Sequence, residues 1–217
     1  MKLRFQADTQ GAILPYDYPA RIGREFYRRT EGDHDGQSLH SIGWIRGGEV
    51  DVTRQGFVIT GTPRWSLGVG RTGPLEAFLE SVDEDPEILP GVQIRYPEPV
   101  SPPAKETVEY VADSPILARR GREHLRYDDP EADAVLTRSL ETKLHKLTGG
   151  EVPVQAAFAP TDAARTKVMS TGKAEHRGNL CRIRVETRPE AQKLVPSVGV
   201  GALTGMGFGS VLPEEAM

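Results

Sequence analysis

The spacing of apolar residues divides the first half of the chain into alternating and helical segments. Apolar and polar residues alternate in the strand segments, whereas the helical segments repeat apolar residues every three or four positions. Two alternating runs, at 49–53 and 57–61, flank a glycine-containing turn at 54–56 and predict a hairpin. In chain order the predicted elements are a strand at 2–7, a helix at 19–30, strands at 49–53 and 57–61, a helix at 74–83 and a strand at 92–96.

The second half repeats this order of elements. Its long helix has an apolar face at three- and four-residue spacing and is followed by Gly149 and Gly150, which favour a helix end. The predicted elements are a strand at 107–118, a helix at 130–147, strands at 152–158 and 180–187, a short helix at 189–195 and a strand at 206–212. Each half therefore follows the β-α-β-β-α-β order of a ferredoxin-like unit. We predict an α+β fold of two tandem ferredoxin-like (RRM-like) domains.

A proline-rich stretch separates the two halves. Four prolines lie between residues 97 and 103. Proline lacks the amide donor that a sheet needs. We therefore expect an N-terminal domain at 1–97, a stiff linker at 98–105 and a C-terminal domain at 106–217.

Composition is that of a globular protein. Of the 217 residues, 37% are hydrophobic and 27% are charged. No apolar run approaches the about 20 residues of a membrane span, and the N-terminus lacks the apolar core of a signal peptide. The single cysteine, Cys181, is compatible with a reducing compartment. These features predict a cytoplasmic protein without a membrane partner.

The charge is unevenly distributed along the chain. The net charge is −4, but residues 163–188 contain seven Lys or Arg residues and only two acidic residues. Three further arginines lie close together at 119, 120 and 122. Because local charge steers a polyanion, these segments predict a phosphate-binding face, with an ordinary solvated surface as the alternative.

A glycine-rich loop lies near the C-terminus. Its glycines are Gly199, Gly201, Gly205, Gly207 and Gly209. Glycine permits positive φ and close backbone approach, and successive free N–H groups can form an anion nest. The loop lacks the Lys-Ser/Thr ending of a Walker loop and the helix that follows a dinucleotide fingerprint. It predicts a phosphate cradle without a nucleotide cofactor, or else a purely structural connection between the last helix and strand.

Candidate catalytic residues are few. With five histidines and one cysteine in no paired spacing, a zinc site is not expected. His40 lies in a polar stretch after the first helix, which we predict to be a loop, and histidine can act as an acid or base near neutral pH. Tyr27 precedes it on the helix, where it could equally be a packing residue. Arg46 follows and could offset phosphate charge or be a solvated cation.

Several motifs together resemble the CRISPR-associated endoribonucleases that process precursor CRISPR RNA, in the repeat-associated mysterious protein (RAMP) superfamily. The glycine loop, Gly199 to Gly209, matches the Gly-x-Gly and Gly-aromatic-Gly signature of that superfamily. The sequence Leu14-Pro-Tyr-Asp-Tyr18 resembles the family's LPYNY segment. Leu39-His40 resembles its LH pair, and Ser114-Pro-Ile116 its SPI segment. The resemblance covers nearly the whole chain and implies two ferredoxin-like domains.

What the resemblance implies is metal-independent cleavage within a CRISPR repeat, with no cofactor. The 2′-OH of the substrate would attack the adjacent phosphate and leave a 2′,3′-cyclic phosphate and a 5′-OH. By position, His40 would be one acid/base group, Tyr27 a candidate second, and Arg46 the cation where the family often has lysine. The chain departs from the family at Ala202-Leu-Thr204, where relatives often have a charged or polar EKN insert.

The resemblance also implies the RNA contacts. Relatives grip the repeat with the long hairpin that here carries Lys167, Lys173 and Arg177. Arg119, Arg120 and Arg122 could contact the phosphates of a stem, and the glycine loop could pack against RNA. The implied partner is CRISPR repeat RNA. A homodimer and membership of a CRISPR effector complex stay open.

Two other functions are compatible with the sequence. The first is a RAMP-type scaffold that holds guide RNA in an effector complex without cutting it, for which a histidine at position 40 would be unnecessary. The second is an unrelated tandem RRM module. It is disfavoured because the predicted strands have few exposed aromatic residues for base stacking.

Overall fold

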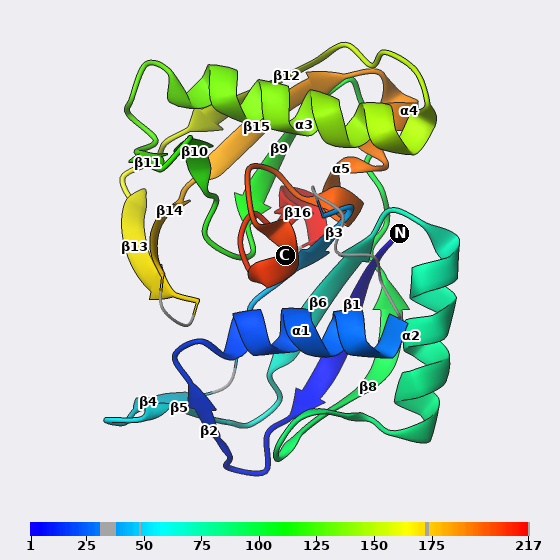
Figure 1. Ribbon diagram of the computed structural model, residues 1–217, viewed down its shortest axis with the longest axis vertical. Coiled ribbons are helices and arrows are strands. Elements are labelled where there is room, and N and C mark those ends of the chain that lie inside the picture. Colours follow the sequence, from blue (N-terminus) through cyan, green and yellow to red (C-terminus); the bar gives the residue numbers. More distant parts are fainter. Residues whose placement is uncertain (31–37, 48, 172–173, 217) are drawn as a thin grey trace.

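The computed structural model describes residues 1–30, 38–47, 49–171 and 174–216 (Figure 1). These residues build two main antiparallel sheets, each packed against helices, and three smaller sheets of two or three strands. The apolar core of the first sheet draws on residues 3–94, and that of the second on residues 108–211.

The first sheet has β1 (Lys2–Asp8) at its centre. Alternation along β1 directs Leu3, Phe5 and Ala7 into the core. Helices α1 (Tyr18–Thr30) and α2 (Thr72–Glu84) pack against each other and against this sheet (Figure 1). The strand order is β3 (His40–Ile42), β6 (Arg64–Val69), β1 (Lys2–Asp8), β8 (Val92–Pro99) and β7 (Glu87–Leu89).

The second sheet repeats the arrangement around β9 (Thr107–Ala112). Helix α3 (Ala132–Thr148) lies along it and buries Leu136, Leu140 and Leu144. The short helices α4 (Pro189–Gln192) and α5 (Val195–Val198) follow the last long strand. The strand order is β12 (Val154–Ala159), β15 (Arg182–Thr187), β9 (Thr107–Ala112) and β16 (Val211–Pro213).

Both sheets therefore have ferredoxin-like strand order, and the predicted α+β class is confirmed. One assignment was wrong. The middle strands of the first half are β3 and β6, whereas the predicted hairpin, β4 (Glu49–Val52) and β5 (Gly56–Thr60), joins β2 (Ile13–Pro15) in a separate small sheet. The reason is burial: β6 is almost continuously buried and does not alternate, whereas β4 is exposed throughout.

Other boundaries also differ from the prediction. The first strand of the second half ends at Ala112, and a separate small hairpin follows, formed by β10 (Ala118–Arg120) and β11 (Glu123–Leu125). The predicted last strand shortens to β16 because residues 204–206 form a 3₁₀ turn, η1. A second such turn, η2 (Glu214–Ala216), follows β16.

Two further differences concern the connections between elements. The basic connection of the second half is itself a hairpin of β13 (Arg165–Ser170) and β14 (Glu175–Leu180). Strand β8 continues to Pro99, which pairs with Leu3, so residues 98–99 of the predicted linker lie in a sheet. The proposed domain limits otherwise stay a prediction.

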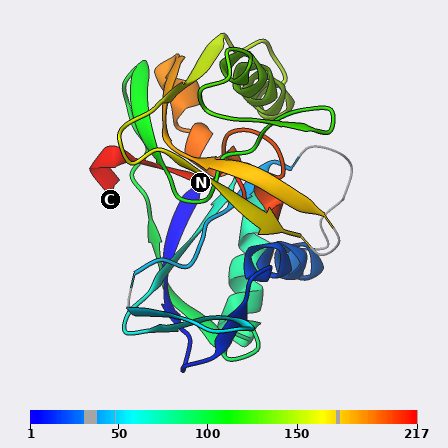
Figure 2. The same ribbon diagram turned by 90° about the vertical axis from the view of Figure 1, so that its left-hand side faces the viewer.

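A buried polar cluster joins the two halves. Lys2 Nζ on β1 donates to Ser210 Oγ at 2.5 Å, and Ser210 Oγ donates to the carboxylate of Asp113 at 3.0 Å. Ser66 Oγ on β6 also donates to Asp113. Because these groups are buried and mutually bonded, they fix the second half against the first. Figure 2 shows the β13–β14 hairpin leaving the second sheet and extending toward the first half.

Candidate active site

His40 opens strand β3 and lies in a closed aromatic environment. Its backbone pairs with Val69 on β6, so the predicted loop position was wrong. His40 is 6% exposed, and its imidazole packs against two rings of α1. Its centroid lies 4.6 Å from that of Phe26 and 4.8 Å from that of Tyr27. The structure thus brings together two of the three predicted catalytic residues.

A serine and a glycine complete this site. Tyr27 Oη and Ser38 Oγ lie 3.0 Å apart. A Cβ added to Gly205 would collide with His40 Nε2 and lie 2.7 Å from Ser38 Oγ. The glycine loop therefore covers His40, and only a residue without a side chain fits. Sequence reasoning missed Ser38, which lies two positions before His40 in a stretch of many polar residues.

The imidazole is held neutral. Burial, and secondarily the charge of Lys143, lowers the pKa of His40 to about 3. His40 Nε2 is buried and has no hydrogen-bond partner among the residues that the structure describes. A buried nitrogen left unpaired is unusual, because such a group costs about 1–3 kcal/mol. It is therefore an acceptor or donor available to another molecule once Gly205 moves away.

Lys143 on α3 anchors the glycine loop through hydrogen bonds. Its buried Nζ donates to the carbonyls of Val198, Gly199 and Gly201 at 3.2, 3.2 and 2.9 Å, and to Thr204 Oγ1 at 3.3 Å. Burial lowers the pKa of Lys143 to about 7, while the surrounding oxygens favour the ammonium form. Its position in a polar-rich helix gave no signal of this role, because its partners lie 55–61 residues away in the sequence.

The glycines of the loop have packing roles. Gly199, Gly201, Gly207 and Gly209 have positive φ, and a Cβ on Gly201 would lie 2.6 Å from Leu117 O. Amides of the loop bond within the protein: Val200 N donates to Gly209 O, and Gly209 N to Pro115 O, both at 2.8 Å. These bonded amides are not free for an anion nest, which supports the structural alternative for those positions. Contact between this loop and RNA stays a prediction.

Arg46 lies apart from His40. The backbone of Arg46 forms an isolated β-bridge with that of Arg64. The backbone of His40 pairs with Val69, which lies five residues after Arg64 on β6. Five residues of strand span about 17 Å. The Arg46 guanidinium donates to the carbonyls of Asp113 and Ala112 at 2.9 and 2.8 Å and lies 3.5 Å from the Asp113 carboxylate. This geometry assigns Arg46 to the junction between the halves.

The predicted RNA-binding cations have different surroundings. Arg120 is paired with Glu123 and Glu131, which neutralise it, whereas Arg122 is exposed in the β10–β11 turn. Arg119 and Arg177 flank His124, and their charges add to burial in lowering its pKa. Lys167 lies on β13, and Lys173 lies outside the described residues.

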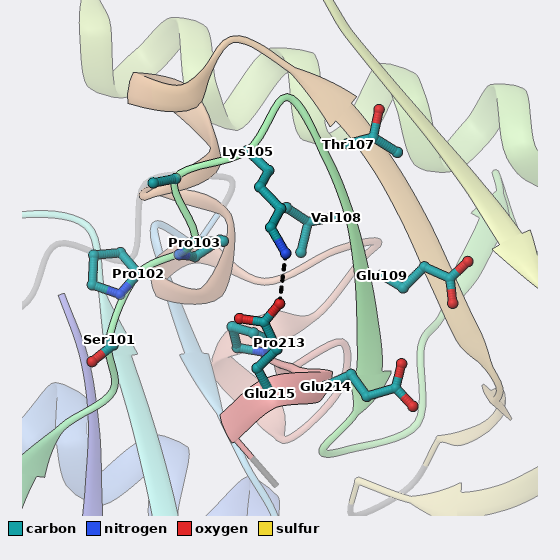
Figure 3. Close-up of a pocket in the computed structure, with 11 residues that line it drawn as sticks. Ser101, Pro102, Pro103, Lys105, Thr107, Val108, Glu109, Pro213, Glu214 and Glu215 are labelled. Carbon is teal, nitrogen blue, oxygen red and sulfur yellow. Dashed lines mark hydrogen bonds and ion pairs between the residues drawn. The ribbon is translucent and has the colours of Figure 1, made fainter.

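A hollow of about 560 Å³ lies between the connector at 101–105, β9 and the C-terminal segment (Figure 3). Its charged lining residues are Lys105, Glu109, Glu214 and Glu215, and Lys105 is already paired with Glu215 at 2.7 Å. Excess carboxylate repels phosphate, so this hollow is not suited to RNA.

Among the described residues, no cluster of three or more His, Cys, Asp or Glu side chains is placed to hold a metal ion. No helix in this part of the chain is both long and apolar enough to cross a membrane.

The fold and the glycine loop define a RAMP-type protein, and comparisons with known proteins identify the family. Residues 96–212 match the family described as CRISPR associated protein Cas6, C-terminal. This match spans more than half of the chain, which therefore belongs to the CRISPR-associated Cas6 family, as the motifs predicted. No curated protein matches the chain.

Solved structures share the fold over the whole chain. A Cas6-related protein from Pyrococcus furiosus has a TM-score of 0.79 at 14% identity and covers 100% of this chain and 99% of its own. A RAMP protein described as binding different RNA substrates has a TM-score of 0.77 at 16% identity, covering 98% and 99%. A Cas6 product complex has a TM-score of 0.62 at 15% identity, covering 98% of each chain. At these identities the likeness establishes the fold alone.

Proposed function

We propose that this chain is an endoribonuclease that cleaves within the repeats of precursor CRISPR RNA. Three observations support the proposal: membership of the Cas6 family, a fold shared with a Cas6 product complex, and the His40 site. The observation that carries it is the buried Nε2 of His40, which has no hydrogen-bond partner among the described residues. A protein that only holds RNA needs no such nitrogen.

The reaction uses the substrate's own nucleophile and no metal. The 2′-oxygen attacks the adjacent phosphorus, the bond from phosphorus to the 5′-oxygen breaks, and a 2′,3′-cyclic phosphate and a 5′-OH result. The 2′-OH loses its proton and the leaving 5′-oxygen gains one, so the site needs a proton acceptor and a proton donor.

His40 is the proposed proton acceptor. A neutral imidazole can take the 2′-OH proton at Nε2, in the tautomer that carries its own proton on Nδ1. Approach of a phosphate raises the pKa of His40 from its lowered value, because the negative charge stabilises the imidazolium. Access requires that Gly205 move off the ring, so RNA binding and displacement of the loop are coupled in this proposal.

Tyr27 is the proposed second group. Its hydroxyl lies beside Ser38 Oγ, at the rim of the same site, and a phenol can donate a proton to the 5′-oxygen. The proposed RNA contacts are Arg119, Arg122, Lys167 and Arg177, together with Lys173 outside the described residues. Arg120 is a weaker contact because its charge is already paired. A catalytic part for Arg46 stays a prediction.

A non-catalytic RNA-holding scaffold is the second candidate function. The closed packing of His40, with Gly205 over its Nε2, is the observation in its favour. The RAMP relative described as binding different RNA substrates shares the fold with this chain. Assembly into an effector complex belongs to this alternative.

The test is cleavage of the repeat RNA of the source organism in EDTA, followed under single-turnover conditions. We expect cleavage by the unaltered protein, and none of a substrate with 2′-deoxyribose at the cut site. His40→Ala should slow cleavage by about 10²–10⁴-fold, the usual contribution of an acid/base group, with RNA affinity preserved. His145→Ala, an exposed histidine on α3, is the matched control and should cleave normally.

Tight RNA binding without cleavage by the unaltered protein would favour the scaffold. Persistent cleavage by His40→Ala would retain the nuclease and remove His40 from the chemistry. Tyr27→Phe separates the acid from a packing role, because the phenylalanine ring keeps the contact with His40 and loses only the hydroxyl.

A further inference from the structure

An apolar cleft opens between the small sheet of the first half and strand β13. It has a volume of about 340 Å³, within the range of small-ligand sites. Tyr16, Trp44 and Phe57 line it from the first half, and Lys167 and Val168 from β13. The rings are already arranged: Tyr16 meets Phe57 edge to face with centroids 4.9 Å apart.

The surface around this cleft is unusually apolar. Of the seven large hydrophobic side chains exposed in the described part of the chain, three line the cleft: Tyr16, Val50 and Val168. Isolated exposed apolar residues need no explanation, but a contiguous group around a hollow marks a binding site.

The cleft is also positively charged. Lys167 Nζ lies 4.6 Å from the centroid of Trp44 and 5.7 Å from that of Phe57. Burial, and then the charges of Arg165 and Arg46, lowers the pKa of Lys167. Lys167 forms no ion pair with any residue that the structure describes. An aromatic hollow with an unneutralised cation fits a flat, apolar group attached to an anion.

We propose that this cleft holds one unpaired nucleobase of the bound RNA, stacked on the Tyr16 and Trp44 rings, with the adjoining phosphate at Lys167. Every base has a π-face, so such a site takes single-stranded RNA with little sequence preference. The proposal deepens the proposed function and rests on it for the identity of the RNA.

The cleft connects directly with the cover of His40. Trp44 Nε1 donates to Gly207 O at 3.1 Å, and Gly207 lies two residues from Gly205 in the loop. Trp44 and Leu203, the residue before η1, both pack against the apolar cluster of Leu117, Met169 and Phe208. A base stacked on Trp44 therefore contacts a residue that is hydrogen-bonded to the glycine loop. In the proposed reaction this loop must move before cleavage.

The first experiment measures binding directly, without cleavage. The probe is a ten-nucleotide oligouridine, compared with the same oligomer built from abasic spacers. The chain has two tryptophans, and Trp65 is 1% exposed in the core, so fluorescence quenching by the probe reports Trp44. We expect quenching by oligouridine only, and affinity about 5- to 150-fold higher than for the abasic probe.

Variants locate the site. Tyr16→Ala should lose at least about 5-fold in oligouridine affinity and nothing for the abasic probe. Tyr96→Ala removes an exposed tyrosine of β8 outside the cleft lining and is the matched control. Lys167→Met should reduce the salt dependence of binding by about one phosphate contact, whereas Lys146→Met on α3 should not. The last pair keeps the test valid if Tyr16→Ala fails to fold.

Three outcomes would overturn the proposal: equal affinity for both probes, equal behaviour of the Tyr16 and Tyr96 variants, or a Tyr16→Ala effect on oligomeric state alone. The last would assign the cleft to a second protein copy. Repeat cleavage by the unaltered protein, measured separately, distinguishes the two proposals. Cleavage without base-dependent quenching would support the nuclease proposal and overturn the base-binding cleft. Base-dependent quenching without cleavage would support the cleft and overturn the nuclease proposal.

Discussion

The His40 site and the Trp44 cleft lie beside the same glycine loop, yet they differ in exposure and charge. His40 is 6% exposed, neutral and covered by Gly205, whereas the cleft contains Lys167, which is exposed and has no ion-pair partner in the described part of the chain. An exposed cation attracts a polyanion over several ångströms, whereas a neutral buried nitrogen attracts nothing until contact. Under the two proposals above, the cleft binds RNA first and the covered His40 site then reacts with it.

The loop between the two regions determines whether they act independently. It is joined to the cleft through Gly207 and Trp44, to His40 through Gly205, and to α3 through Lys143. A substitution at one of these three contacts should therefore change cleavage at the His40 site and RNA binding at the cleft to different extents. The variants below test this expectation.

The largest effect is expected at Gly205. Gly205→Ala places a methyl group against His40 Nε2 and Ser38 Oγ, and since the ring is buried, overpacking should cost about 1–3 kcal/mol of folding stability. Displacement of the imidazole should slow cleavage by about 100-fold, within the range of an acid/base group. Oligouridine binding at the cleft should change little. Single-turnover cleavage, probe binding and thermal melting measure the three quantities.

The control for this variant is Gly73→Ala on α2. A Cβ there meets nothing within 4 Å, so the change should be neutral or stabilise by about 0.4–1 kcal/mol. If Gly205→Ala cleaves normally, the loop does not cover the reactive face of His40, and the contrast between a closed and an open region fails.

The second effect concerns Lys143. Lys143→Met removes the donor from three carbonyl oxygens and Thr204 Oγ1 in the interior, which should cost about 3 kcal/mol of folding stability. Lys146→Met, an exposed lysine on the same helix, should cost little. Denaturant unfolding of both variants against the unaltered protein gives these values.

The stability difference between the unaltered protein and Lys143→Met should depend on pH. The folded-state pKa of Lys143 is about 7, against 10.5 for an ordinary lysine, so between these values the folded protein binds fewer protons than the unfolded chain. The stability contribution of Lys143 therefore rises with pH in this window, by up to about 1.4 kcal/mol per pH unit. We expect the difference to widen from pH 7 to 9. A constant difference would mean that the carbonyl oxygens keep the ammonium form despite burial.

The sequence predicted elements whose burial is one-sided. Strand β1 alternates, and α1, α2 and α3 each bury one stripe, so period alone located them. It misassigned the middle of the first half, because the buried run Trp65–Val69 of β6 has no alternation. It missed β13 and β14 because both are largely polar and pair with each other away from the main sheets.

The candidate site was predicted where short motifs exist. The Leu39-His40 pair and the glycine signature located His40 and the loop, and Tyr27 followed from its helix position. Lys143, Trp44 and the Lys167 contact had no such signal. Lys167 on β13 meets Trp44 only after the two halves pack, and Lys143 meets acceptors that lie 55–61 residues further along the second half. Spacing within one segment cannot encode such contacts.

The smallest effect is expected at Arg46, which was predicted from family position to be catalytic. Its guanidinium holds Ala112 O, Asp113 O and the Asp113 carboxylate, so Arg46→Ala should lower stability by about 1–2 kcal/mol, a modest figure because the side chain is 38% exposed. Single-turnover cleavage should fall less than 10-fold, because about 17 Å of strand separates Arg46 from His40. Arg138→Ala, an exposed arginine on α3, is the matched control.

The opposite pattern would relocate the catalytic centre. A cation that stabilises the phosphorane contributes about 10²–10³-fold to the rate, so such a loss without a change in stability would place the scissile phosphate at the junction between the halves. His40 would then lie too far away to contact the reacting atoms, and its burial beneath Gly205 would have a structural explanation only. Measured together, the rates and unfolding free energies of the Arg46 and His40 variants therefore decide which of the two positions contains the chemistry.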